Sequence, residues 1–362
     1  VNPEKLHDNQ QVMAMIEVKI TPEREGGFDR VGNGVRGGCH VAEGVYHGGE
    51  GHIAKGSAKA LERGAAAVLC EAVTDELLIS GAPYVQVEDT RLALALASST
   101  LFGNPASAMT VIGITGTSGK TSVSVLLKQV LEETRGRKVG LIGTLGIQIG
   151  PRALHSERTT PESYELQKLF RMMADEGCDT VVMEVSSHAL QLKRVAGIRF
   201  NTAVYTNLSQ DHLDYHKTMA AYLEAKMKLF PLSAAAAVNG DDPAAETILP
   251  RLKTPVITYG LGEGCRLRAT EVELLPDRVC FTAEFDGERA PAVLHIPGRF
   301  SVYNALCAIA VARFFDCDEL ASVVIPDSCT YIGASAFRNC YKLATVELGS
   351  SLANIDEFAF AW

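Results

Sequence analysis

The clearest hydrophobic pattern in the chain starts at Met109. A mainly apolar run, Met109–Thr115, predicts a buried strand, and a short glycine-containing stretch follows it at Gly116–Thr121. After this stretch, apolar side chains recur at helical spacing, as at Val123, Leu127 and Leu131, with polar residues between them. The pattern therefore predicts a strand, a glycine loop and a helix in direct succession.

The alternation of strand and helix continues to Phe315. Further apolar runs predict strands at 138–142, 180–185, 202–206, 235–239 and 256–259, and helical patterns lie between them at 163–176 and 219–230. Residues 265–296 alternate in the manner of a β-hairpin, and a helix is predicted over 299–315. Strands that alternate with helices favour an α/β fold with a mostly parallel sheet covered by helices.

Upstream of Met109 the pattern is weaker. The stretch Lys55–Glu71 predicts a short alanine-rich helix, a glycine stop and an apolar strand, whereas residues 26–51 are too rich in glycine for a regular core. A break at Gly103–Ser107 ends this part. We therefore expect a small α/β N-terminal domain at 1–107 and a central domain at 108–316 that contains the glycine loop.

The chain changes character after Phe315, where two segments match at a constant offset of 23 residues. The matched pairs are Val323 with Val346, Ile325 with Leu348, Ile332 with Ile355, Ala336 with Ala359, and Phe337 with Phe360. A fixed period of this length is typical of a leucine-rich-repeat solenoid, and the segments resemble the repeats of BspA-like surface proteins. Residues 317–362 are thus expected to form a short leucine-rich-repeat-like tail, although a solenoid core usually needs about three repeats or more.

Composition narrows the classes of function. The chain has 362 residues, 47% of them apolar, and a formal net charge of -9. This balance argues against nucleic-acid and anionic-membrane binders, which need an excess of Lys and Arg. The nine cysteines form no C-x-x-C pair, which argues against a disulfide framework or a zinc site. The sequence shows neither a secretory leader nor an apolar run of about 18 residues. Together with the cysteine usage this favours a reducing cytoplasm, and we expect a monomer.

The loop Gly116–Thr121 has the residues that a phosphate site requires. Backbone N–H groups of a glycine loop at a helix N-terminus can surround phosphate oxygens, Lys120 supplies a positive charge, and the Thr121 hydroxyl can bind magnesium. The loop is a G-x-x-G-K-T variant, shorter than the G-x-x-x-x-G-K-T form because position 114 is Ile. An ordinary glycine turn is the alternative, but Lys and Thr placed after a strand favour ATP binding.

Polar residues follow two other predicted strands. Glu184 ends the run VVME, where a carboxylate either binds Mg²⁺ beside the phosphates or is an ordinary surface glutamate. Asp211 and His212 lie beyond the next strand in a His-rich loop that suits contact with a metal or phosphate, although a single His is more often structural. Lys226 lies on an apolar helix, where pattern alone predicts a surface lysine with a buried stem.

Several long motifs together resemble those of one enzyme family. In the order and spacing of the Mur ligases, the chain contains TGTSGKTS, RTTPES, MEVSSHAL, TNLSQDHLDYHKTMAAYLEAKMKLF, VNGDDP and PGRFSVYNAL. The resemblance is close over residues 109–315 and weak over 35–71. Several motifs in order are far more specific than any single one.

The resemblance implies a cytoplasmic, ATP-dependent ligase of peptidoglycan synthesis. Within the family, the chain is most similar to the branch that adds an amino acid, meso-diaminopimelate or L-lysine, to UDP-N-acetylmuramoyl-L-alanyl-D-glutamate (UDP-MurNAc-L-Ala-D-Glu). In that family the γ-phosphoryl group of ATP passes to the substrate carboxylate, and the incoming amine attacks the resulting acyl phosphate.

The resemblance also implies roles for individual residues. ATP would be held by Gly116, Thr117, Ser118, Gly119, Lys120 and Thr121, with Asn304 near the adenine. One Mg²⁺ would be bound by Thr121 and Glu184, and a second by His212 and a carbamylated Lys226. Catalysis would depend on Lys120, Glu184, His212 and Lys226. The UDP-muramoyl substrate would be bound by Thr159, Thr160, Ser186 and Arg194, whose hydroxyls and guanidinium suit phosphate or carboxylate oxygens.

The chain departs from the family pattern at several points. Ser301 stands where the family usually has Asn, and Leu192 stands where a glutamine often contacts substrate. The D-S-R element that helps the family hold the uridine nucleotide is reduced here to Phe28-Asp29-Arg30. These departures concern mainly the recognition of the substrate.

The largest departure follows Phe315. The family continues there into a third α/β domain with an Asp-Asn-Pro-Arg type motif that selects the amino acid, and no such motif occurs in this sequence after Phe315. We therefore expect this chain to bind ATP and Mg²⁺ but to be incomplete for catalysis. Two alternatives stay open: a related ligase of the folylpolyglutamate synthetase type, and a non-catalytic interaction protein whose repeat tail binds partners while the ligase portion is a relic.

Overall fold

The computed structural model describes residues 67–314 and, in the tail, residues 322–325, 327, 330–332 and 345–355. The chain divides into two compact units, one formed by 1–104 together with 192–197 and the other by 105–191 together with 198–362. The segment Leu192–Gly197 thus belongs with the first unit although it lies far along the chain. The two units are described separately below.

The first unit contains a small parallel sheet. Strand β1 (Val68–Cys70) pairs with β2 (Tyr84–Gln86), and α3 (Asp75–Ser80) connects them, so the strand expected at the end of 55–71 is confirmed. Helix α4 (Thr90–Leu101) follows and is capped by the Asp89 side chain, which accepts a hydrogen bond from the Leu92 amide at 2.8 Å. The helix expected after Lys55 and the residues 28–30 lie outside the described residues.

The second unit is built around one eleven-stranded sheet. Its strands are β3 (Thr110–Thr115), β4 (Val139–Gly143), β5 (Gly146–Ile149), β6 (Arg152–Leu154), β7 (Thr180–Glu184), β8 (Phe200–Tyr205), β9 (Ser233–Asn239), β10 (Val256–Gly260), β11 (Leu267–Leu274), β12 (Val279–Phe285) and β13 (Glu288–Leu294). Their order is β13-β12-β11-β10-β9-β8-β3-β7-β4-β5-β6. Pairing is parallel from β11 to β4 and antiparallel at both ends, which confirms the mostly parallel α/β sheet.

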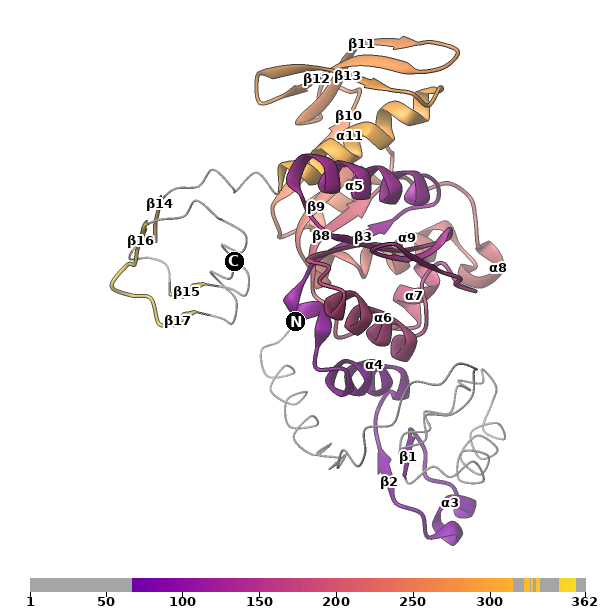
Figure 1. The fold of residues 1–362 in the computed structure, drawn as a ribbon. Coiled ribbons are helices and arrows are strands. Elements are labelled where there is room, and N and C mark those ends of the chain that lie inside the picture. The colour runs from indigo at the N-terminus through magenta and orange to yellow at the C-terminus, as the bar shows by residue number, and fades with distance from the viewer. Residues whose placement is uncertain (1–66, 315–321, 326, 328–329, 333–344, 356–362) are drawn as a thin grey trace. The chain divides into compact units, whose positions relative to one another are not determined.

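Helices cover both faces of this sheet (Figure 1). Helices α5 (Lys120–Arg135) and α11 (Arg299–Arg313) lie on one face, and α6 (Ser163–Asp175), α7 (Ser187–Gln191) and α9 (Met219–Met227) lie on the other. Two single-turn helices, α8 (Leu213–His216) and α10 (Ala245–Ile248), lie in connections. None of the described helices combines the length and the apolar character that crossing a bilayer would require.

The core between the sheet and helices α5 and α11 follows the sequence pattern. Val123, Leu127 and Leu131 of α5 are fully buried and pack in one cluster with Ile112 and Ile114 of β3. Every residue of β3 is buried, as expected for a central parallel strand covered on both faces. Burying this helix stripe fixes the position of the loop that joins β3 to α5.

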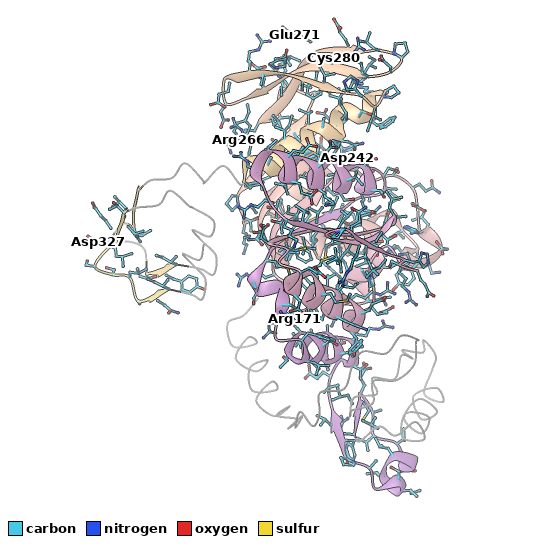
Figure 2. The ribbon with its side chains drawn as sticks, in the orientation of Figure 1. Arg171, Asp242, Arg266, Glu271, Cys280 and Asp327 are labelled. Atoms are coloured by element: carbon cyan, nitrogen blue, oxygen red, sulfur yellow. The ribbon has the colours of Figure 1, made fainter. Side chains whose placement is uncertain are left out.

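The tail forms a ladder whose rungs join residues 23 positions apart. Strand β14 (Ser322–Val324) pairs in parallel with β16 (Thr345–Glu347), and β15 (Tyr331–Ile332) pairs with β17 (Asn354–Ile355). Val323 faces Val346 and Ile332 faces Ile355, so these two matched pairs are confirmed. Asp327 (Figure 2) extends the same offset, because its Oδ1 accepts hydrogen bonds from Ser350 N at 2.6 Å and Oγ at 2.9 Å. The pairs 336/359 and 337/360 lie outside the described residues.

Candidate functional site

Three neighbouring strands bring the candidate residues to one edge of the sheet. Strands β8, β3 and β7 are adjacent and parallel, so their carboxyl ends share an edge. After β3 the chain continues to β4 and β7 on one side of β3, and it later enters β8 on the other side. Such a reversal of strand order is the topological switch point, where α/β sheets bind ligands. The loop Gly116–Thr121, Glu184 and the segment Thr206–His212 all lie at these strand ends.

Neighbouring side chains lie so close to Gly116 and Gly119 of the loop that neither position has room for a Cβ atom. Gly119 caps α5 with a φ of 85°, and a Cβ there would lie 2.9 Å from Asn304 Oδ1. A Cβ at Gly116, whose φ is 145°, would overlap the Thr206 hydroxyl. The structure thus brings Asn304 of α11 directly beside the loop.

Thr206 and Asn207, which follow β8, form hydrogen bonds with backbone groups of the loop. Asn207 accepts from the Thr117 amide at 2.9 Å through its carbonyl and from the Ser118 amide at 2.9 Å through Oδ1. Asn207 Nδ2 and Thr206 Oγ1 both donate to the Ser118 carbonyl, at 3.0 Å and 2.7 Å. Two amides of the loop that could bind an anion are therefore engaged with Asn207.

Lys120 folds back over the same loop. Its Nζ donates to the carbonyls of Gly116 at 2.9 Å and Thr117 at 2.8 Å. Burial lowers the pKa of the ammonium, while the negative charges of Glu184 and Asp211 act in the opposite direction. The positive charge that a phosphate would meet is thus already held at the loop, in the field of both carboxylates.

Glu184 is a buried carboxylate rather than a surface one, with 1% of its surface exposed. It accepts hydrogen bonds from Thr144, from the amide at 2.9 Å and from the hydroxyl at 3.1 Å. The Thr144 hydroxyl lies 3.1 Å from that of Thr159, so Thr159 joins the same network. A buried carboxylate is costly unless it is hydrogen-bonded or paired with positive charge, and this one has hydrogen bonds and the nearby charge of Lys120.

Thr160 and Ser186 also meet beside Glu184. The Thr160 hydroxyl donates to the Glu184 carbonyl at 2.9 Å and accepts from the Ser186 amide at 3.1 Å. Three of the four residues assigned to the muramoyl substrate are thus brought together. Arg194 lies in the segment that belongs with the first unit, where the neighbouring Lys193 forms an ion pair with Asp89.

His212 and Lys226 gather around a cluster of aromatic rings. His212 adopts a left-handed backbone conformation, with a φ of 52°, at the start of α8. Its ring lies 6.0 Å from that of Tyr222, and the Lys226 ammonium lies 4.1 Å from the centroid of the Tyr222 ring. The rings of His188 and His216 complete the cluster, 5.4 Å apart.

Lys226 is buried, contrary to its appearance in the sequence as a surface lysine. Only 1% of its surface is exposed, and burial together with the charge of Lys120 lowers its pKa to about 7, against the opposing effect of Asp211. A buried amine with such a pKa is partly neutral near pH 7, and a neutral amine is a nucleophile.

The donor set fits magnesium. Glu184 ends β7 and Thr121 lies in the first turn of α5, and a carboxylate and a hydroxyl are the kinds of oxygen ligand that Mg²⁺ prefers. Within the described residues, no three His, Cys, Asp or Glu side chains are grouped closely enough to hold a metal by themselves. This suits an ion that is held by one or two carboxylates together with water and substrate phosphates.

Sequence reasoning missed Thr144, Asn207 and Tyr222 as parts of this site. Asn207 lies two residues beyond the end of β8, and its position shortly after an apolar strand was the available signal. Tyr222 reads as one more apolar residue of α9, and Thr144 lies in a turn whose contact with Glu184 spans 40 residues.

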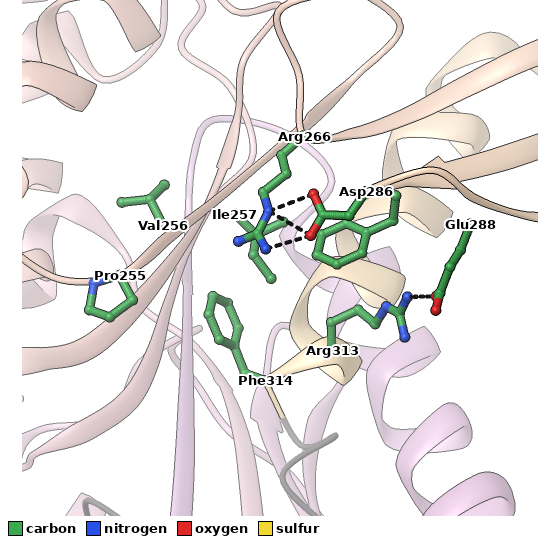
Figure 3. Close-up of a pocket in the computed structure, with 9 residues that line it drawn as sticks. Pro255, Val256, Ile257, Arg266, Asp286, Glu288, Arg313 and Phe314 are labelled. Carbon is green, nitrogen blue, oxygen red and sulfur yellow. Dashed lines mark hydrogen bonds and ion pairs between the residues drawn. The ribbon is translucent and has the colours of Figure 1, made fainter. Parts of the chain in front are cut away.

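A separate cavity of about 500 Å³ lies elsewhere in the second unit (Figure 3). Two ion pairs line it: Arg266 with Asp286, with Nη2 to Oδ2 at 2.6 Å, and Arg313 with Glu288. The two guanidiniums both lie 4.7 Å from the Phe285 ring. No residue assigned to the phosphate site lines this cavity.

Known protein families match both the middle part of the chain and its tail. Residues 114–312 match the family described as the Mur ligase middle domain, and residues 301–362 match one described as a BspA type leucine rich repeat region. A UDP-N-acetylmuramoyl-L-alanyl-D-glutamate--2,6-diaminopimelate ligase of Clostridium botulinum is 43% identical over 261 residues, which are 72% of this chain and 53% of that protein. The chain therefore spans about half the length of the curated relatives it matches.

The fold is also similar to that of solved structures. One titled as a UDP-N-acetylmuramoyl-L-alanyl-D-glutamate--2,6-diaminopimelate ligase matches with a TM-score of 0.65 and 27% identity, over 72% of this chain and 54% of that chain. A folylpolyglutamate synthase of Mycobacterium tuberculosis, complexed with ADP, matches with a TM-score of 0.52 and 20% identity, over 63% of this chain and 59% of that chain. The second likeness shows a shared fold alone.

Proposed function

The chain belongs to the Mur ligase family, and we propose that residues 105–314 bind ATP for a ligase that forms an amide bond. The observation that carries the proposal is that the loop Gly116–Thr121, called the phosphate loop below, and Glu184 lie at the carboxyl ends of adjacent parallel strands. The buried Lys226 of α9 is close enough to feel the charge of Lys120 in this loop. Phosphoryl transfer needs positioning and charge neutralisation more than covalent help, and this edge offers both.

Each part of the edge has a role in this proposal. Gly116–Thr121 holds the phosphates through backbone N–H groups and Lys120, and Asn304 beside Gly119 adjoins the nucleotide. Thr121 and Glu184 would hold one Mg²⁺, and His212 with a modified Lys226 would hold a second. When bound, Mg²⁺ neutralises charge on the phosphate oxygens.

The modification proposed for Lys226 is carbamylation. The ammonium group would first lose a proton, and the neutral amine would then attack the carbon of CO₂ and release a second proton. The resulting carbamate places a negative charge where the buried cation was. The burial of Lys226, its pKa of about 7 and its contact with the ring of Tyr222, which also lies near the ring of His212, support this proposal. A carboxylate there would supply the oxygen ligand that His212 lacks as a partner for Mg²⁺.

The substrate is proposed to be UDP-MurNAc-L-Ala-D-Glu, bound by Thr159, Thr160, Ser186 and Arg194. Its carboxylate would attack the γ-phosphorus and release ADP; the amine of the incoming amino acid would then displace phosphate from the acyl phosphate. The name of the 43% identical relative favours meso-diaminopimelate over L-lysine as that amino acid. A cytoplasmic location and a monomeric state stay predictions.

Calorimetric titration with MgATP tests the proposal. Lys120→Ala should weaken binding by about 100-fold, since charge-assisted hydrogen bonds contribute about 1.5–3 kcal/mol each. Lys253→Ala, which removes an exposed lysine, is the matched control and should bind as the parent does. No binding at millimolar MgATP would favour the non-catalytic interaction protein instead.

A second titration addresses the related-ligase alternative. A uridine diphosphate nucleotide and a folate can be compared on the same protein with nucleotide present. Binding of the uridine nucleotide supports the muramoyl substrate, whereas binding of the folate alone would contradict it.

A further inference from the structure

We propose that Tyr222 is a positioning residue that transmits occupancy of the phosphate loop to Lys226. The inference rests on the proposed nucleotide site and adds to it a mechanical connection between two parts of the site. Tyr222 is 1% exposed and lies on α9, between the loop and the lysine. One end of its side chain contacts each of them.

The hydroxyl end contacts the phosphate loop. Tyr222 Oη lies 3.3 Å from Thr117 Oγ1, across 105 positions of sequence. The Thr117 hydroxyl also accepts from the Ser209 amide at 3.0 Å and donates to the Ser209 carbonyl at 3.3 Å. Tyr222 is thus attached to the loop through a threonine that is itself held by the segment after β8.

The ring end contacts Lys226. The two residues are four positions apart on one helix, and the ammonium lies 4.1 Å from the ring centroid. The ring of His216 lies 5.1 Å away at a tilt of 32°, and His216 Nε2 is 2.9 Å from the Ser187 hydroxyl in a buried contact. Because the Tyr222 ring is packed between fixed neighbours, a displacement at its hydroxyl is transmitted to the ring.

For this transmission to occur, phosphate binding must change the hydrogen-bond partners of Thr117. In the structure, the amides of Thr117 and Ser118 are bonded to Asn207, and Lys120 Nζ donates to the Thr117 carbonyl. An anion that uses these amides and this ammonium replaces those bonds, so the backbone on both sides of Thr117 changes partners. The hydroxyl on the same residue then shifts relative to Tyr222.

The test measures the reaction of Lys226 with acetic anhydride, by peptide mass spectrometry, with and without saturating ADP. EDTA is present throughout, so that no metal can bridge nucleotide and lysine. In the parent protein ADP should change the rate at Lys226 by about fivefold or more, the lower end of ordinary coupling between sites. Lys253 is exposed and provides the internal reference, which should not respond.

Two variants separate positioning from folding. Tyr222→Phe keeps the ring over Lys226 but removes the contact with Thr117, so the rate without ADP should stay near the parent value while the response to ADP is lost. Thr117→Val removes the same contact from the other side, and combining both variants should add nothing. Tyr84→Phe removes a hydroxyl from β2 in the first unit and should keep the full response.

The outcomes distinguish this inference from the proposed function. Failure of the parent to bind ADP would overturn the proposed nucleotide site and the inference with it. Binding of ADP without any change at Lys226, or a full response in Tyr222→Phe, would overturn the inference alone. In parallel, ¹³C NMR with labelled bicarbonate shows whether Lys226 forms a carbamate; the acetylation is run in buffer freed of CO₂, because a carbamate would block the amine.

Discussion

The α/β part of the second unit (105–191 and 198–314), called the middle region below, and the repeat tail (322–355) both contain parallel strands. They differ in how far apart in the sequence the paired residues lie. In the middle region β3 pairs with β7 and β8, which lie about 70 and 90 residues further along the chain. In the tail every described rung spans 23 residues. Long-range pairing brings chemically different residues to one edge, whereas a constant short range repeats the same residues along a surface.

This difference explains where the candidate chemistry lies. Lys120, Glu184 and Lys226 belong to three separate strand-and-helix connections, and each is partly or fully buried beside the others. The tail instead exposes large side chains such as Val324, Tyr331 and Leu348. Among the described residues, the proposed site for charged substrates thus lies in the region with non-local topology.

The largest effect is expected when one substitution is made in both regions. Ile112→Ala removes a fully buried side chain from β3 and should lower the free energy of unfolding of the middle region by about 2–5 kcal/mol. Ile332→Ala truncates a buried side chain of the tail and should change that value by less than about 0.5 kcal/mol, since repeats interact mainly with neighbouring repeats.

Urea unfolding followed by far-UV circular dichroism measures the helices of the middle region. Fluorescence of the one tryptophan, Trp362, reports separately on the tail sequence. Equal losses of middle-region stability from the two substitutions would show that the tail is an integral part of the middle fold.

The next effect concerns the buried carboxylate. Glu184→Gln preserves the size of the side chain but removes its charge. The factor by which saturating Mg²⁺ raises the affinity for ATP should therefore fall about tenfold, which corresponds to 1.4 kcal/mol. Titrations with ATP at several Mg²⁺ concentrations measure this. Glu224→Gln, which removes an exposed carboxylate paired with Arg251, is the control. An unchanged Mg²⁺ dependence in Glu184→Gln would remove Glu184 from the proposed metal site.

A smaller effect is expected at Cys265 of the middle region. Burial, followed by the charge of Asp241 and a hydrogen bond to it, raises the pKa of this thiol to about 11. Since the thiolate is the reactive form, alkylation by iodoacetamide should be slow at pH 8 and rise about tenfold for each pH unit below pH 11. Peptide mass spectrometry gives the rate, and Asp241→Asn should raise it at pH 8. A rate that levels off near pH 9 would contradict the prediction.

The smallest effect belongs to the tail. Hydrogen bonds from the Ser350 amide and hydroxyl lower the pKa of Asp327 below its ordinary value of 3.8. A carboxyl group with a lowered folded pKa stabilises the fold above its unfolded pKa and loses that contribution as the pH falls through the folded value. The contact should therefore persist at pH 5 and weaken only below 3.8. Carboxyl NMR titration measures this, and Ser350→Ala should bring the pKa back toward the ordinary value.

Local features of the fold could be predicted from the sequence. The loop between β3 and α5, the buried stripe of α5 and the 23-residue offset each depend on residues that are near in sequence or repeat at a fixed interval. The helix expected over 219–230 ends instead at Met227, and a short 3₁₀ turn, Phe230–Leu232, follows. Pro231 suits this turn, because it lacks the N–H that a continuing helix would need.

Features that depend on non-local contacts could not be predicted by pattern alone. Lys226 is buried on α9, which packs against α7 and α8, and no spacing in the sequence distinguishes it from a surface lysine. The hydrogen bonds between Glu184 and Thr144 and between Tyr222 and Thr117 join residues far apart in the sequence, so only the structure reveals them. The antiparallel extension formed by β5 and β6 was also missed, because its strands are short.

The constant offset of the tail has a consequence for how this part of the molecule can change over generations. Duplicating or deleting one 23-residue unit would leave every remaining rung, including a contact of the Asp327–Ser350 kind, with the same partners. An insertion between β3 and α5, in contrast, would move Lys120 away from its carbonyl partners. The number of repeats in the tail can therefore change without altering the contacts that remain, whereas the length of the loop between β3 and α5 cannot.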